Sequence, residues 1–348
     1  MRKLLCLLGA CLLGLPISGG ACDLCGCYTP QLKSMANSNP DRLVPGPTWQ
    51  DRFYGAVSEQ FTHFGTLQLD GNGVPDPTGQ YLNSSITQLV AGYTLSKRLA
   101  IQLNVPLIYR SFKRPEGFQI DQGTESGLGD ISLVANLLLF HTESGGRREV
   151  NFEDPKSPRM EVHEPDFAFS ASFIGGLKFP TGDSSRLKEE FHESEIDGAP
   201  ESGIHGHDLT LGSGSYDGIL GGQAILRYRN FFFEQGLQFT VRGDGAHQYH
   251  FANDLSWSGG PGYYFVRDSR RIIGCEAIFS GEYKGVDRFR GEPAGDTGIT
   301  LLAAGPRFLL SLGRVSGEIG VEFPFLINNT SLQAVPDYRI TGAISFGF

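Results

Sequence analysis

The chain has few methionines and tryptophans, fewer basic than acidic residues, and no apolar run after residue 21 that is long enough for a membrane-spanning helix. Its 348 residues include 3 Met and 2 Trp, and 29 basic side chains stand against 38 acidic ones. Proteins that bind nucleic acid carry a basic surface, so the charge balance argues against a nucleic-acid partner. A helix needs roughly 20 consecutive apolar residues to cross a bilayer, so a bundle of membrane helices is not expected.

Recognisable catalytic motifs are missing as well. The stretch "SGSYD" at 213–217 contains serines but lacks the Gly-x-Ser-x-Gly turn and the strand-turn-helix around it that a hydrolase needs. The histidines show no order typical of a catalytic triad. We therefore predict that the protein is not an enzyme, and a lipid-acting hydrolase remains the enzymatic alternative.

The first 21 residues have the pattern of a secretory signal peptide. Arg2 and Lys3 precede a short apolar stretch, and Gly19-Gly20-Ala21 offers a small-residue cleavage site. We predict an exported protein whose mature chain begins at Cys22. Removal of the leader leaves 27 basic and 38 acidic residues, a net charge of -11.

Beyond the leader, glycine is abundant (47 residues), Phe and Tyr are plentiful, and apolar and polar residues alternate with the period of a β-strand. The alternation predicts about twelve strands, at 52–69, 81–95, 98–110, 127–141, 166–179, 216–228, 230–243, 249–265, 271–285, 297–312, 314–327 and 339–348. Short connections such as Ser96-Lys97 and Gly313-Arg314 alternate with longer ones at 70–80, 111–126, 180–206, 286–296 and 328–338. The segment 142–165 breaks this rule and is interpreted as a long periplasmic turn.

Two all-β architectures account for this alternation. A secreted sandwich would turn its polar faces outward to water, whereas a membrane barrel turns its apolar faces to lipid and its polar faces to a lumen. Export, long strands and an even strand count favour a transmembrane antiparallel up-and-down β-barrel in the bacterial outer membrane. The sequence then divides into a signal peptide (1–21), a periplasmic Cys-bearing linker (22–50) and the barrel (51–348).

Charged residues in phase with the polar faces are the candidates that would line the lumen. A charged side chain that faces lipid at mid-depth costs roughly 2–4 kcal/mol for Arg or Lys, so these residues are expected to point inward. The predicted set is Arg110, Lys178, Arg227, Glu234, Arg242, Glu276, Glu282, Glu318, Glu322 and Arg339. They would form either a narrow pore or a salt-bridge network that fills the barrel. Asp130 and Asp217 would also face the lumen, and solvation at the rim is the preferred interpretation for both.

Three cysteines follow the cleavage site closely, at Cys22, Cys25 and Cys27. In an oxidising compartment two of them would form a disulfide. The spacing also suits a soft metal, Cu(I) or zinc, and acylation of Cys22 or incidental spacing are further alternatives. Covalent haem is disfavoured because Gly26, not His, follows Cys25.

The loop at 180–206 and the residues after it carry His192, His205 and His207 among several acids. These histidines could gather a cation outside the cell, although solvated loop charge is the preferred interpretation. Cys275, in contrast, falls in the lipid-facing phase of its strand with Ile273 and Phe279, and is interpreted as an apolar filler.

Three stretches, "GLGDISL" at 127–133, "KFPTGD" at 178–183 and "LGSGSYDGILGG" at 211–222, carry a family resemblance. The chain resembles bacterial outer-membrane transporters of the meta-pathway phenol-degradation type from about residue 50 to its end. The resemblance implies passage of small, often apolar, molecules across the outer membrane. It does not identify a substrate or cover the cysteines.

We predict from these observations a porin-like outer-membrane channel or transporter for small solutes, with outer-membrane lipid around it. The alternative is a non-transporting barrel that scaffolds a periplasmic metal or redox partner through its N-terminal cysteines.

Overall fold

The computed structural model describes residues 52–145, 147–150, 161–191, 197–268 and 271–347. The predicted signal peptide, the linker with Cys22, Cys25 and Cys27, and His192 lie outside the described residues. These predictions therefore stay predictions.

Twelve antiparallel passes form a closed barrel in chain order, because the last strand pairs with the first. The strands are β1 (Phe53–Leu69), β3 (Tyr81–Ser96), β4 (Leu99–Glu116), β5 (Gln119–Leu128) with β6 (Ser132–Ser144), β9 (Phe167–Lys178), β10 (Asp217–Tyr228), β11 (Phe231–Val241), β13 (Asp254–Arg267), β14 (Arg271–Lys284), β17 (Ile299–Leu312), β18 (Val315–Asn329) and β19 (Leu332–Gly347). One pass consists of two strands, β5 and β6, which lie end to end and both pair with β4. The predicted all-β, up-and-down barrel is confirmed.

The alternation of side chains explains why each strand takes its place in this wall. In β11, exposed Phe231, Phe233 and Leu237 alternate with buried Glu234 and Gln238. Successive side chains of a strand point to opposite faces, so one face meets the outside and the other the interior. Closure leaves the sheet without a free end, as a β protein in hydrocarbon requires, and β5, at the extracellular end, pairs only with β4.

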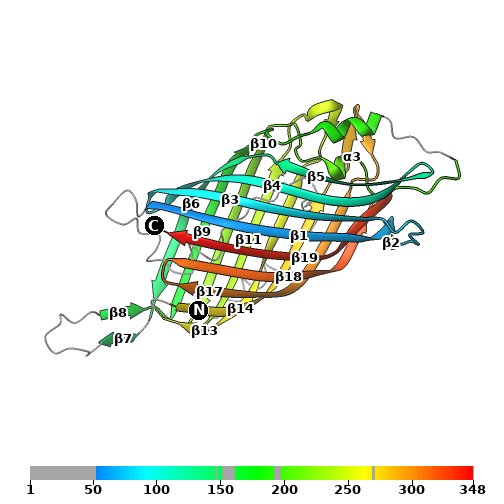
Figure 1. Ribbon diagram of the computed structural model, residues 1–348. Coiled ribbons are helices and arrows are strands. Elements are labelled where there is room, and N and C mark those ends of the chain that lie inside the picture. The colour runs from blue at the N-terminus through cyan, green and yellow to red at the C-terminus, as the bar shows by residue number, and fades with distance from the viewer. Residues whose placement is uncertain (1–51, 146, 151–160, 192–196, 269–270, 348) are drawn as a thin grey trace, which may run out of the picture.

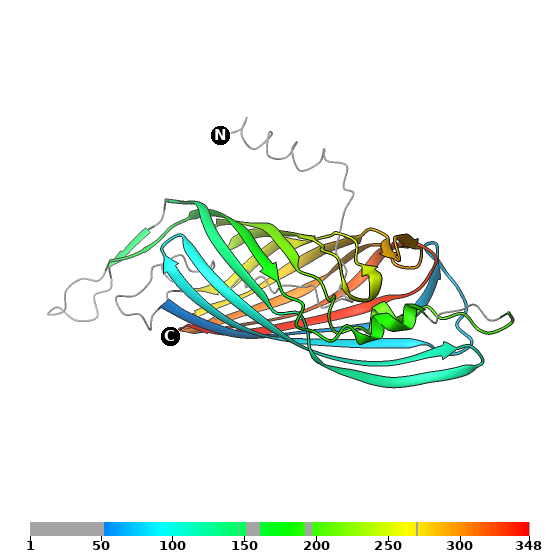
Figure 2. The same cartoon turned by 90° about the horizontal axis from the view of Figure 1, so that it is seen from above.

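The two ends of the barrel differ in their connections (Figures 1 and 2). One end carries β2 (Asn72–Gly73), the 3-10 helices η3 (Ser185–Phe191) and η4 (Ala246–Gln248), the short helix α3 (Gly206–Leu209), and a small sheet of β12 (Tyr249–His250), β15 (Asp287–Phe289) and β16 (Glu292–Ala294). The other end has tight turns, the last residues of β19 and a hairpin of β7 (Arg147–Val150) and β8 (Glu161–Glu164). Short turns mark the periplasmic end of outer-membrane barrels, so the α3 end is extracellular.

Helices play little part in this architecture. Among the described residues, no helix combines the length and apolar character needed to cross a membrane.

Two predicted loops are wrong because the strands continue through them. Residues 111–126 belong largely to a hairpin of β4 and β5, and residues 328–338 are spanned by the ends of β18 and β19. Both stretches lie at the extracellular end, where polar residues interrupt the outward apolar face, so the alternation that marks a lipid-facing strand is lost there. The described part of 142–165 contains the β7–β8 hairpin at the periplasmic end.

Candidate functional site

The outside of the barrel is apolar along its length. Large exposed side chains cover the outward positions of the strands, among them Leu107, Leu137, Leu177, Leu220, Leu237, Phe279, Phe308, Ile319, Phe323 and Ile344. At the periplasmic end, exposed aromatic residues pair across strands, as Phe231 does with Tyr263 at a ring distance of 4.8 Å. An apolar band flanked by aromatic residues is the surface that lipid requires.

The inside of the barrel carries many polar and charged side chains, beside small clusters of buried apolar ones. Of the ten charged residues predicted to face the lumen, nine are buried on the inner wall and Glu318 is half-buried. This distribution is the reverse of a water-soluble protein. The protein is an outer-membrane β-barrel.

Glu59 departs from this rule. Its side chain is in the outward phase of β1. The strand register places it at the same height as exposed Leu107 of β4 on one side and exposed Ile319 of β18 on the other. The hydroxyls of Ser85 and Thr87 on β3 donate hydrogen bonds to its two carboxylate oxygens. The two donors offset part of the cost of a carboxylate at this depth.

A row of opposite charges runs around the extracellular part of the inner wall, and we call it the charge ladder. Lys178 Nζ lies 3.1 Å from Asp130 Oδ2 and 2.7 Å from Asp217 Oδ2. Arg242 continues the row, with Nη1 2.9 Å from Asp217 and Nε 2.7 Å from Asp254. The members are Asp130, Lys178, Asp217, Arg242, Asp254, Lys284 and Asp287.

The interpretation of Asp130 and Asp217 as solvated rim residues is wrong. Both are buried. Asp130 accepts hydrogen bonds from the backbone N–H groups of Gly182 and Ser213, and Asp217 accepts one from the hydroxyl of Ser215. A buried charge is stable only when it is paired and hydrogen-bonded, which the ladder provides.

The other predicted lumen residues form smaller groups nearer the periplasm. Arg339 pairs with Glu282 at 2.6 Å, and Ser280 donates a hydrogen bond to Glu322. Arg227 donates a hydrogen bond to the carbonyl of Pro165. Glu234, Glu276 and Glu318 surround Arg307.

Arg307, Asp254, Lys284 and Asp287 are lumen residues that the sequence analysis missed. In β17 both faces are rich in apolar residues, so the period-two pattern gives no inner face at Arg307. Its charge was the available signal, because an arginine in a lipid-exposed strand must face inward. Lys284 is the last residue of β14, and Asp287 belongs to β15 in the small extracellular sheet. The alternation of the barrel strands stops before both positions.

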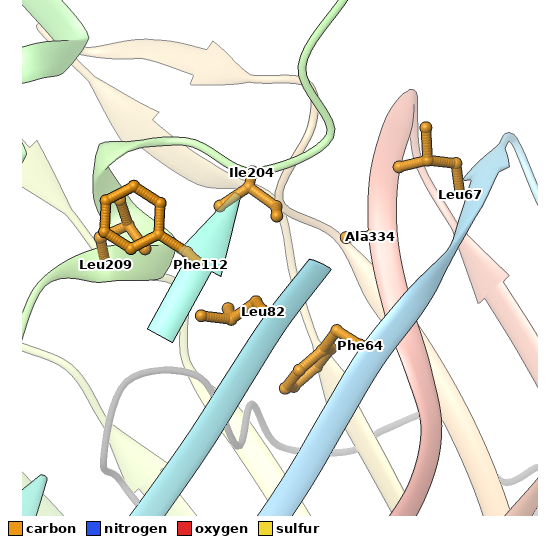
Figure 3. Close-up of a cluster of buried hydrophobic side chains, with 7 residues drawn as sticks. All are labelled: Phe64, Leu67, Leu82, Phe112, Ile204, Leu209 and Ala334. Atoms are coloured by element: carbon orange, nitrogen blue, oxygen red, sulfur yellow. The ribbon is translucent and has the colours of Figure 1, made fainter. Parts of the chain in front are cut away.

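The described residues of the connection between β9 and β10, 179–191 and 197–216, pack against the inside of the wall, and we call them the inner loop. Ile204 and Leu209 join a buried apolar cluster with Phe64, Leu82 and Phe112 of β1, β3 and β4 (Figure 3). The loop also pairs with β19, where the N–H of Ala334 donates to the carbonyl of Gly203. The inner loop therefore occupies part of the extracellular end of the lumen.

Arg110 anchors this loop from β4. Its side chain is fully buried, and Nη1 lies 2.5 Å from the carbonyl oxygens of both Asp208 and Thr210. These carbonyls lie at the C-terminal end of α3, and a guanidinium satisfies them while it gains partners for its own charge.

His207 is a second anchor within the loop. It is buried, its Nδ1 lies 3.0 Å from Glu190, and its Nε2 lies 3.4 Å from Asp208. Its ring stacks on that of His205, which pairs with Asp296 at 3.2 Å. The interpretation of these histidines as solvated loop charge is wrong for His207.

Burial alone would lower the pKa of His207. The carboxylates of Asp208 and Glu190 outweigh burial and, with Asp296, raise the pKa well above 6.5. Protonated His207 therefore stabilises the folded inner loop fully below about pH 6.5, and this stabilisation is lost as the pH rises through the raised pKa. We expect the inner loop to be cleaved faster by protease at pH 10 than at pH 7.

The comparison for this prediction is His207→Gln, which cannot take up the proton. Limited proteolysis of both proteins in detergent, with an unfolded substrate to correct for the protease's own pH dependence, measures the effect. Equal pH dependence of loop cleavage in the two proteins would contradict a role for this imidazolium.

The predicted loop metal site remains a prediction, because His192 lies outside the described residues. Among the residues that the structure describes, no group of three or more His, Cys, Asp and Glu side chains could hold a metal ion. Cys275 is a free cysteine and half-buried.

No protein-family model matches the sequence, and no curated protein matches it significantly. Among solved structures, the barrel is similar to the COG4313 outer membrane channel from Pseudomonas putida F1, with a TM-score of 0.55 and 14% identity over 85% of this chain and 95% of that one. The β domain of the Bordetella autotransporter BrkA gives a TM-score of 0.40 at 9% identity, over 85% and 99% of the two chains. At this identity the first likeness shows the fold alone.

Proposed function

We propose that the protein is a channel that passes small solutes across the outer membrane. The observation that carries the proposal is the inner wall, which is charged from Lys178 and Arg242 at the extracellular end to Arg227 and Glu234 near the periplasm. A polar lumen inside an apolar exterior is the arrangement of water-filled outer-membrane barrels. The likeness to the COG4313 channel is in keeping with this role.

The inner loop sets the size of the solutes. It fills part of the extracellular lumen with Ile204, Leu209 and α3, so the remaining passage is narrow. The family resemblance of 127–133, 178–183 and 211–222 implies small, often apolar, solutes and identifies no substrate. The charged wall favours small polar solutes, because its side chains can replace hydrogen bonds that such a solute makes to water.

We propose a transport role without a catalytic step. Ser213 and Ser215 of the "SGSYD" stretch are buried, and their hydroxyls donate hydrogen bonds to Asp130 and Asp217. A nucleophilic serine needs access to its substrate, and these buried hydroxyls instead satisfy carboxylates of the ladder, so we assign them a structural role.

Recordings from planar bilayers test the proposal. The purified protein is expected to give reproducible conductance steps in KCl, and the empty detergent control none. Absence of steps from correctly folded protein would overturn the channel and favour the scaffold alternative.

A further inference from the structure

Five charged side chains join the β4–β5 hairpin to the inner loop at the extracellular end, and we call them the clasp. The members are Arg114 of β4, Asp121 and Glu125 of β5, and Arg186 and Glu189 of η3. Arg186 Nε donates a hydrogen bond to Glu125 at 2.9 Å, and its Nη1 contacts Glu189. Arg114 Nη2 lies 2.7 Å from Glu189 and 3.1 Å from Asp121. The charges alternate in sign along the clasp, so it ties η3 to both strands of the hairpin.

The clasp stands where the wall offers the inner loop no strand to pair with. β5 pairs with β4 alone among the described residues, whereas β6 and β9 pair with each other. Figures 1 and 2 show the hairpin beside the inner loop at the α3 end. In the described part of the chain, no backbone hydrogen bond joins the inner loop to β5. Side-chain contacts such as the clasp therefore hold the loop to this strand.

The clasp lies at the boundary between the protein and water. The side chains of Glu125, Arg186 and Glu189 are 28%, 26% and 31% exposed. Salt screens such charges, because the Debye length falls from about 10 Å at about 0.1 M to about 3 Å at about 1 M. The Arg110 anchor differs, since it is fully buried and bonds to neutral carbonyls. The inner loop is thus held by one contact that salt reaches and one that it does not.

The clasp also adjoins the apolar cluster that docks the inner loop. The guanidinium carbons of Arg114 and Arg186 lie 5.6 and 5.5 Å from the ring centroid of Phe112. Cations within about 6 Å of an aromatic ring are attracted to its face. Phe112 itself packs with Ile204 and Leu209 of the inner loop. Movement of η3 away from the hairpin would remove Arg186 from this ring and loosen the docked loop.

We propose that the clasp is a salt-sensitive latch, which holds the inner loop over the passage and releases it as ionic strength rises. The inference rests on the proposed channel and adds the regulation of its passage. At low ionic strength the alternating charges keep η3 on the hairpin, and the passage is narrow. At high ionic strength the partly exposed pairs are screened, η3 leaves the hairpin, and the passage widens.

Single-channel recordings in KCl test the latch through the ratio of open to closed time. This ratio is the measure, because conductance rises with salt in any water-filled channel. In the wild type the ratio is expected to rise about fivefold between about 0.1 M and about 1 M KCl. Arg186→Gln removes the pairs with Glu125 and Glu189. This variant should show the high ratio already in the dilute salt and respond little to more.

Reversal of the charges separates pairing from the shape of the side chains. Arg186→Glu and Glu125→Arg each place like charges together, so each alone should raise the open ratio at least as far as Arg186→Gln does. The double variant restores an attraction between the two positions. Its open ratio should return toward the wild-type value and should again respond to salt. A structural role that does not depend on charge would give no such rescue.

Arg288→Gln is the matched control. It removes the same charge from β15 at the same end of the barrel, where the side chain is exposed. The open ratio and its salt response should both stay as in the wild type. Folding of each variant is verified by its heat-modifiable mobility on gels.

The outcomes distinguish the latch from the channel. Conducting wild-type protein whose open ratio ignores salt, or an Arg186→Gln variant that behaves as Arg288→Gln does, refutes the latch and leaves the channel standing. Silent bilayers refute the channel, and limited proteolysis in dilute salt then decides whether the clasp holds the loop. Cleavage of the inner loop about fivefold faster in Arg186→Gln than in the wild type supports that hold, and equal cleavage refutes it.

Discussion

Replacement of Lys178 by methionine should lower the free energy of unfolding by about 3–5 kcal/mol, the cost of breaking a buried ion pair by removing one partner. The ammonium lies within 3.1 Å of both Asp130 and Asp217, whose side chains are 0% exposed. Methionine fills a similar volume but leaves the carboxylates of Asp130 and Asp217, which lie on either side of β9, without the ammonium between them. Urea unfolding in detergent, followed by intrinsic fluorescence, measures the loss.

Arg271→Met is the matched control for this prediction. Arg271 pairs with Asp268 at 2.9 Å, but the two side chains are 62% and 39% exposed. Exposed pairs contribute about 0–1 kcal/mol, so the control should lose no more than that. Equal losses in the two variants would mean that burial of the charge ladder contributes nothing to stability.

Replacement of Arg110 by methionine should release the inner loop and raise the conductance of the channel. Two charge-assisted hydrogen bonds to the carbonyls of Asp208 and Thr210 are lost, and each is worth about 1.5–3 kcal/mol. A loss of about 3 kcal/mol shifts the balance between docked and released loop by roughly 100-fold. Single-channel recordings should show larger or longer-lived open states than in the wild type.

Lys113→Met is the control for the Arg110 variant. Lys113 lies three residues further along β4 in the outward phase, where its ammonium donates to the carbonyl of Thr78 at 2.6 Å. Its removal should leave the conductance unchanged, because the side chain does not touch the inner loop. If Arg110→Met folds and conducts as the wild type does, Arg110 does not hold the loop over the passage.

The two predictions concern different parts of the same extracellular end. The charge ladder holds neighbouring strands of the wall together, and Arg110 holds the inner loop against that wall. We therefore expect Lys178→Met to lower the stability of the wall while the inner loop stays docked, and Arg110→Met to release the inner loop while the wall stays folded. Stability and conductance measured on both variants distinguish these cases.

The wall was predictable from the sequence wherever one face meets lipid. Leu103 and Leu107 of β4 alternate with Asn104 and Arg110, and the energetic penalty for charge in lipid fixes which side faces inward. The same rule assigned Lys178 and Glu276 to the interior. It failed at the extracellular end, at 111–126 and 328–338, where the outward face does not meet lipid and therefore need not be apolar.

The partners of these residues were not predictable. Arg307 and Glu234 are 73 residues apart in the chain. Arg242, which follows β11, bridges Asp217 of β10 and Asp254 of β13. Such pairs depend on the register between neighbouring strands and on the closure of the barrel. Glu59 is an exception to the rule that charged residues face the lumen. Two hydroxyls from β3 donate hydrogen bonds to its carboxylate on the outer face.

The sequence by itself determined an all-β fold and the polar face of most strands, and it favoured a membrane barrel over a sandwich, because a sheet in lipid must close and turn its apolar faces outward. The tertiary structure alone decided that Asp130 and His207 are buried, that the inner loop docks on β1, β3 and β4, and that three glutamates meet one arginine. These contacts come from residues far apart in the chain, and strand register and barrel closure bring them together.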